Sequence, residues 1–182
     1  MSPDKKFVKS AQTGVPVSRS NSELERVLRR YGCTGFGVTN DYEQMRCAVT
    51  IRVPDGPEKD ATQIPIKLVV DFRAVYDALY GQPMRWGTKP DGSNGRVHDP
   101  KGYEPKFIEQ AERVAWRHLV LWVDAACSAS TVGLQRMSEA FLAHTLMRTA
   151  DGRVLRVVEQ MDEAAGGNWK ALLPPPKETG GQ

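Results

Sequence analysis

The sequence has few of the residues on which metal, thiol or nucleotide chemistry depends. Its 182 residues include three cysteines and three histidines, which stand far apart, and neither Cys-x-x-Cys nor His-x-x-x-His occurs. A metal centre needs several such side chains to converge, and an odd number of widely spaced cysteines is no disulfide framework. We therefore expect no metal site, no cofactor and no disulfide.

Motifs for nucleotide and nuclease chemistry are also missing. The phosphate-binding pattern G-x-x-x-x-G-K-[ST] does not occur. Pro54-Asp55 resembles the opening of a metal-dependent nuclease motif, but Pro65-Ile66-Lys67 lacks the acidic residue that should come first in the second half. Two-metal chemistry needs those carboxylates as ligands. The sequence therefore predicts no catalytic residues and a non-enzymatic protein.

Long apolar segments are absent. No apolar run approaches the roughly 20 residues that a membrane-spanning helix needs, and the N-terminus does not have the pattern of a secretory signal peptide. Together with the cysteine usage, this predicts a cytoplasmic protein with no membrane partner. A homo-oligomer remains possible.

The excess of positive charge is small, but it is unevenly distributed. The chain carries 25 basic and 22 acidic residues, a net charge of +3. Residues 1–31 hold seven basic and three acidic groups, and residues 81–118 hold seven and five. Two weakly basic regions are a modest electrostatic signal for an anionic partner.

Periodicity predicts an α+β fold, with one domain over residues 20–171 between a flexible basic arm (1–19) and a disordered Pro/Gly tail (172–182). Ser20 and Glu23 have the spacing of a capping box, which predicts a helix that begins at Ser20 and ends before Gly32. Three strands should follow as an antiparallel meander. Pro65 predicts that the third strand lies at an edge, and Asp71 should cap the next helix.

The rest of the domain should contain a long loop, a long central helix and a small C-terminal hairpin with a helix. We expect the loop over residues 81–104, the central helix over 104–129, and a last short helix over Val157–Ala165 after a hairpin around Asp151-Gly152. The alternating run from Met45 to Val53 should pack against an apolar stripe of the central helix. That stripe includes Val114, His118, Leu119 and Trp122.

Two surfaces combine residues suited to nucleic-acid binding. In the long loop, Trp86 stands among Arg85, Lys89, Arg96 and Lys101, and on the first helix Arg26, Arg29 and Arg30 lie close together. Cations contact phosphates and aromatic rings stack on unpaired bases. The alternatives are a solvated loop whose Trp86 tucks into the core, and an ordinary solvated helix face.

Several segments together resemble a family of short, uncharacterised proteins of phages and integrated bacterial mobile elements. The resemblance covers most of residues 15–175, with longer 54–63 and 81–104 loops, and supplies a genetic context but no site residues. In outline, the helix, meander and long helix are similar to those of single-strand annealing recombinases. The segments that carry the family resemblance are Leu24-Glu25-Arg26-Val27-Leu28-Arg29-Arg30-Tyr31-Gly32, Ala115-Trp116-Arg117-His118-Leu119, Glu139-Ala140-Phe141-Leu142-Ala143-His144 and Asp151-Gly152-Arg153.

These observations favour a non-enzymatic accessory protein of a phage or mobile element that binds nucleic acid, in particular single-stranded DNA, during replication or recombination. The alternative is a protein-interaction module, such as an inhibitor of a host factor or defence system. A third interpretation is an enzyme whose site does not show in the sequence. The charge distribution favours the first interpretation, and the small net charge favours the second.

Overall fold

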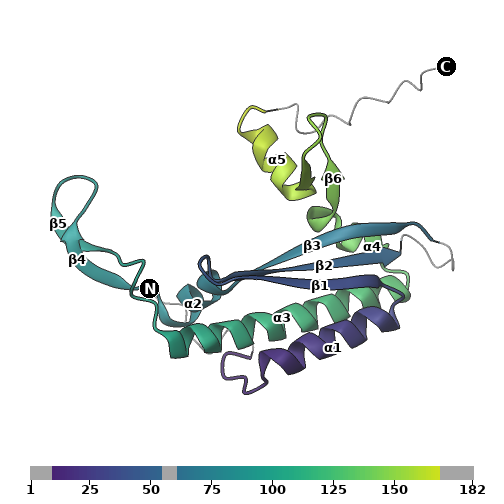
Figure 1. Cartoon of the computed structure of the whole chain (residues 1–182), viewed down its shortest axis with the longest axis horizontal. Coiled ribbons are helices and arrows are strands. Elements are labelled where there is room, and N and C mark those ends of the chain that lie inside the picture. The colour runs from purple at the N-terminus through teal and green to yellow at the C-terminus, as the bar shows by residue number, and fades with distance from the viewer. Residues whose placement is uncertain (1–9, 55–60, 169–182) are drawn as a thin grey trace. The chain divides into compact units, whose positions relative to one another are not determined.

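The computed structural model describes residues 10–54 and 61–168. Contacts within the chain group these residues into two compact units, one made of residues 10–27, 39–48 and 69–124 and the other of 28–38, 49–54, 61–68 and 125–168. The elements in Figure 1 are α1 (Val17–Arg30), β1 (Thr34–Asp41), β2 (Arg46–Pro54), β3 (Gln63–Asp71), α2 (Phe72–Tyr80), β4 (Met84–Thr88), β5 (Asn94–His98), α3 (Pro105–Thr131), α4 (Met137–Ala140), η2 (Leu142–His144), β6 (Leu146–Arg148), β7 (Val154–Arg156) and α5 (Val157–Ala165).

The α+β class is confirmed, with an N-terminal helix, a three-stranded antiparallel sheet, a long helix α3, and a C-terminal helix with a small hairpin. The strand order β1-β2-β3 places β3 at an edge, as Pro65 predicted. Three alternate residues of β2, Cys47, Val49 and Ile51, are fully or almost fully buried, which confirms the period-two pattern. Met45 differs, because it lies in the preceding turn with a φ of 50° rather than in the strand.

Helix α1 begins at Val17, so the predicted start at Ser20 is wrong. The backbone amides of Arg19 and Ser20 already donate to the carbonyl of Pro16, at 3.1 Å each. The Ser20 side chain is fully buried, and its hydroxyl has no hydrogen-bond partner in the described part of the chain. Ser20 therefore belongs to the buried face of the helix and not to its cap.

The inner end of the predicted arm runs into helix α1 and contacts α3. The side-chain amide of Gln110, on α3, donates to the carbonyl oxygens of Ala11 and Thr13, at 3.1 Å each. Helix α3 therefore holds the segment that leads into α1. The remainder of the predicted arm, residues 1–9, and the predicted tail, residues 172–182, lie outside the described residues.

The predicted start and end of helix α2 are confirmed. The Asp71 carboxylate accepts a hydrogen bond from the Ala74 backbone amide at 3.0 Å, and Gly81 follows the helix with a φ of 80°. Tyr76 of α2 packs in a buried cluster with Tyr103 and with Ala111 of α3. Its ring meets the Tyr103 ring edge-on, with 4.9 Å between centroids.

The buried face of α3 differs from the predicted stripe. His118 and Trp122 were expected to face the core, but both are exposed, Trp122 to 41%. Trp116 is 1% exposed instead, and the buried face continues through Val120 and Val123. The middle of this helix is apolar almost all round, so periodicity alone does not identify the side that packs.

The C-terminal elements follow the prediction closely. Helix α5 occupies the expected residues, and β6 and β7 pair antiparallel around the Asp151-Gly152 turn. The Arg153 guanidinium spans from this turn to α5 and donates to both carboxylate oxygens of Glu163, at 2.9 and 2.8 Å. This paired hydrogen bond lowers the pKa of Glu163 and connects the hairpin to the helix.

A pair of tryptophan variants tests the orientation of α3. Trp116→Ala should lower the free energy of unfolding by ~3–5 kcal/mol, because it empties a fully packed position. Trp122→Ala should lower it by about 1 kcal/mol or less, since much of that ring already contacts solvent. Urea unfolding of both variants measures the difference, and equal losses would contradict the assignment of the buried face.

Substitutions at Asp71 test the cap of α2. Asp71→Ala should cost about 1 kcal/mol of stability, because the Ala74 amide loses its acceptor at the helix N-terminus. Asp71→Asn keeps an acceptor oxygen without the charge and should cost much less. If Asn destabilises as much as Ala in urea unfolding, the carboxylate acts through its charge and not as a cap.

Candidate nucleic-acid interface and cationic pocket

The segment predicted as a long loop contains an ordered β-hairpin. Strands β4 and β5 pair antiparallel, with Trp86 opposite Arg96 and Gly87 opposite Gly95. The backbone amide of Lys89 donates to the Ser93 carbonyl at 2.8 Å and closes a tight loop over residues 90–92. In that loop the Asp91 carboxylate accepts from the Ser93 hydroxyl at 2.7 Å, which lowers the pKa of Asp91.

Side chains that were predicted to act together lie on opposite faces of this hairpin, because successive residues of a strand point to opposite sides. The Trp86 face carries Trp86, Arg96 and Met84, and the Arg85 face carries Arg85 and Lys89. Trp86 is 74% exposed, so the alternative in which its ring tucks into the core is wrong.

Two glycines allow the Arg85 face to pack closely. A side chain at Gly95 would collide with the aliphatic stem of Lys89, and a Cβ atom at Gly87 would lie 2.9 Å from a methyl group of Val97. The approach of Val97 favours a residue without a side chain at Gly87, whereas the flexible Lys89 side chain could move away from a larger residue at Gly95. The Lys89 stem therefore covers the strand opposite it.

A chain of hydrogen bonds connects the base of the hairpin to α2. The Tyr103 hydroxyl donates to the Asp77 carboxylate and lies within hydrogen-bond distance of the His98 ring Nε2, at 3.2 Å in both cases. Burial and the neighbouring Asp77 raise the pKa of Tyr103, so the phenol stays protonated and keeps donating. The Asp99 amide also donates to the Pro83 carbonyl at 2.8 Å, which closes the hairpin at its base.

The other predicted cations lie outside the paired strands. Lys101 is in the turn after β5, where its amide donates to the Asp99 carboxylate at 3.1 Å. Arg29 and Arg30 are exposed in the last turn of α1, where positive side chains interact favourably with the helix dipole. The predicted set therefore divides between the hairpin with its following turn and helix α1.

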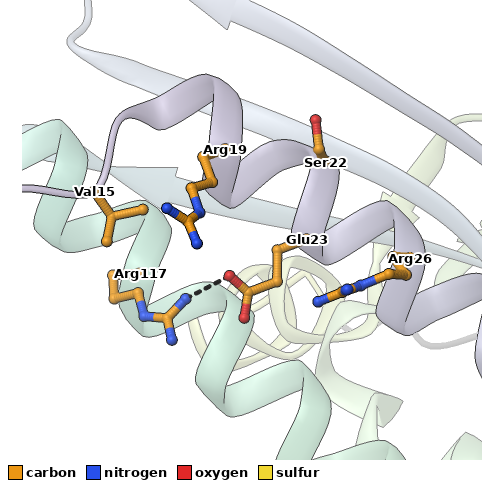
Figure 2. Close-up of a pocket in the computed structure, with 6 residues that line it drawn as sticks. All are labelled: Val15, Arg19, Ser22, Glu23, Arg26 and Arg117. Carbon is orange, nitrogen blue, oxygen red and sulfur yellow. Dashed lines mark hydrogen bonds and ion pairs between the residues drawn. The ribbon is translucent and has the colours of Figure 1, made fainter.

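Arg26 lies in a pocket of about 560 Å³ where α1 runs beside α3 (Figure 2). Figure 2 shows the guanidinium groups of Arg19 and Arg26 on either side of Glu23, while the Ser22 hydroxyl points away from them. Arg117 of α3 binds Glu23 with 2.7 Å between nitrogen and oxygen. We call this site the cationic pocket; the residues that line it are Val15, Arg19, Ser22, Glu23, Arg26 and Arg117.

The sequence interpretation did not include Arg19 and Arg117 in a site. Arg19 was assigned to the arm, and Arg117 was treated as part of a core helix. One sequence pattern is consistent with the pocket: positions 19, 23 and 26 share one face of a helix that begins at Val17. The contact with Arg117 depends on how two helices pack, which no local pattern contains.

The thiols of Cys33 and Cys47 have different surroundings. A hydrogen bond with the Cys127 thiol lowers the pKa of Cys33, whereas burial raises the pKa of Cys47 to about 12. Within residues 10–54 and 61–168, no three His, Cys, Asp or Glu side chains are grouped so as to hold a metal ion. None of the helices described is long and apolar enough to cross a membrane.

Comparison with known proteins supplies no family for the chain. No protein-family model, curated protein sequence or solved structure shows a significant match to it. The resemblance to phage and mobile-element proteins therefore stays a prediction.

Proposed function

We propose that this chain is a non-enzymatic nucleic-acid-binding protein that holds single strands on the Trp86 face of its β4–β5 hairpin. The observation that carries the proposal is the 74% exposure of Trp86 on a hydrogen-bonded strand, directly opposite Arg96. A large aromatic ring displayed on an ordered ribbon offers a flat surface on which an unpaired base can stack.

The register of the hairpin brings the two interactions of this binding mode together. Side chains directly opposite on antiparallel strands have Cβ atoms about 5 Å apart. The Arg96 guanidinium is therefore near enough to the Trp86 ring to contact the phosphate of a nucleotide whose base stacks there. Met84, 41% exposed on the same face, extends the apolar surface beside the ring.

The charge of the hairpin suits a polyanion. Residues 84–101 contain four basic and two acidic side chains, so the segment has a net charge of +2. Arg85 and Lys89 lie on the opposite face from Trp86, so they can contact phosphates only where the backbone of the bound strand passes the edge of the ribbon. Such contacts position a strand without reading its sequence.

The biological setting follows from the resemblance. A small protein of a phage or mobile element that binds single strands would serve replication or recombination as an accessory factor, in the cytoplasm. The proposal assigns no catalytic residue and no cofactor to this role.

One observation favours the alternative of a protein-interaction module, such as an inhibitor of a host factor. Several large apolar side chains of the C-terminal segment are exposed, Leu134 to 80% and Val132 to 68%. Exposed apolar side chains of this kind occur at protein–protein contacts when they form one patch. This alternative uses a different part of the chain from the hairpin.

The test is a binding measurement with Trp86→Ala on single-stranded and double-stranded DNA of the same sequence. We expect a loss of ~1–3 kcal/mol on the single strand and little change on the duplex, since only unpaired bases offer a free ring face. Trp86→Phe should retain part of the affinity. Trp122→Ala removes another exposed tryptophan outside the hairpin and should leave binding unchanged.

The dependence of DNA affinity on salt concentration separates the contribution of the cations from that of Trp86. Replacing Arg85 and Lys89 with alanine should weaken binding to all sequences and flatten the slope of log affinity against log salt by about one unit for each lost contact. If neither single nor double strands bind at low salt, the proposed function is wrong. Capture of a protein partner that depends on Leu134 would then support the alternative.

A further inference from the structure

The cationic pocket contains more positive charge than its own carboxylate can balance. Three of its lining residues are arginines and one is Glu23, so the pocket has a net charge of +2. Glu23 and Arg117 form one ion pair, at 2.7 Å. Within the described residues, Arg19 and Arg26 have neither an ion-pair partner nor a side-chain hydrogen bond.

The pocket holds part of this charge in a fixed position. The side chains of Arg117 and Glu23 are only 24% and 27% exposed, so their ion pair is partly shielded from solvent. An arginine has five N–H donors in a rigid fork, and Glu23 uses one Arg117 nitrogen. Glu23 therefore orients Arg117 while leaving further donors available to a ligand.

Both helices that form the pocket are anchored nearby. Val15 lies at the rim and follows Ala11 and Thr13, whose carbonyls are bound by Gln110 of α3. Leu24, one residue after Glu23, is fully buried. Arg19 and Arg26 are seven residues apart on α1, so they project from the same face about two turns apart. Glu23 lies between these two guanidinium groups (Figure 2), so an anion in the pocket would bind beside its carboxylate, against Arg117 and the nearer of Arg19 and Arg26.

We propose that the cationic pocket binds a phosphoryl group in the form of a phosphate monoester. A monoester carries close to two negative charges near neutral pH and has three acceptor oxygens, which match the net charge of the pocket and its several guanidinium forks. Arginine pairs with phosphate through two parallel hydrogen bonds, which a lysine cannot form. A ligand with a single carboxylate carries one negative charge and would balance only half of the pocket's net charge of +2.

The monoester can come from the end of a nucleic-acid strand or from a small phosphorylated molecule. The volume of about 560 Å³ exceeds what a phosphoryl group alone would fill, so a sugar or base attached to it can also enter. This inference goes beyond the proposed function, because it concerns a different surface and does not need Trp86.

The experiment is a calorimetric titration of the full chain with inorganic phosphate at low ionic strength. We expect saturable binding that Arg19→Ala and Arg26→Ala each weaken about tenfold, and that Arg19→Lys weakens by a smaller factor because the charge remains without the fork. Arg148→Ala removes an exposed arginine on β6 and should change the affinity less than about twofold. Circular dichroism confirms that each variant is folded.

Two results would overturn the inference. One is binding that does not saturate up to about 10 mM phosphate, because so low an affinity would not indicate a specific phosphate site. The other is an equal loss in Arg148→Ala, because the effect would then reflect total charge rather than the pocket. Either result would leave the proposed function of the hairpin untouched.

Oligonucleotides identical except for a terminal phosphate distinguish the two sources of the monoester. A preference for the phosphorylated end that Arg26→Ala abolishes would support the pocket and identify a strand end as its ligand. Equal affinity for both oligonucleotides, with saturable phosphate binding retained, would support a small phosphorylated molecule. Phosphate binding without any oligonucleotide binding would keep this inference and refute the proposed function.

Discussion

Burial of one face of α3 is the constraint on which the candidate sites of the first unit depend. Ala111 packs with Tyr76 and Tyr103, and the Tyr103 hydroxyl in turn connects His98 at the base of the hairpin to Asp77 of α2. The adjacent Gln110 holds the segment before α1. Farther along the same helix, Arg117 binds Glu23 and completes the cationic pocket. Each solvent-facing site is therefore attached to a residue positioned by the core packing of α3.

Elements with local causes could be predicted from the sequence, and those that depend on tertiary packing could not. Asp71 caps α2 through an amide three residues away, so the signal and its effect are both local. The buried side of α3 is set by what packs against it, and for that reason Trp116, not Trp122, is in the core. Ser20 matches a capping pattern, but burial of its side chain places it inside a helix that begins earlier.

In the candidate sites, too, the sequence predicted the local features and not those that depend on how strands and helices pack. Composition identified the cations and the aromatic of the 81–104 segment, because Trp86 stands among basic residues in the sequence. The hairpin itself was missed because Gly87 and Gly95 have low strand propensity. In the folded hairpin Gly87 leaves room for Val97, and Gly95 lies beneath the Lys89 side chain. Only strand register shows that Arg96 shares the Trp86 face and that Arg85 does not.

The small net charge of +3 limits how this protein can attract an anion. A weak overall field contributes little to steering, so affinity must come from contacts at short range. The hairpin and the cationic pocket each have a local net charge of +2, and they present it differently. On the hairpin the charge lies beside an exposed ring and suits an extended strand. In the pocket it converges from two helices and suits a single doubly charged group, so geometry rather than total charge separates the two ligands.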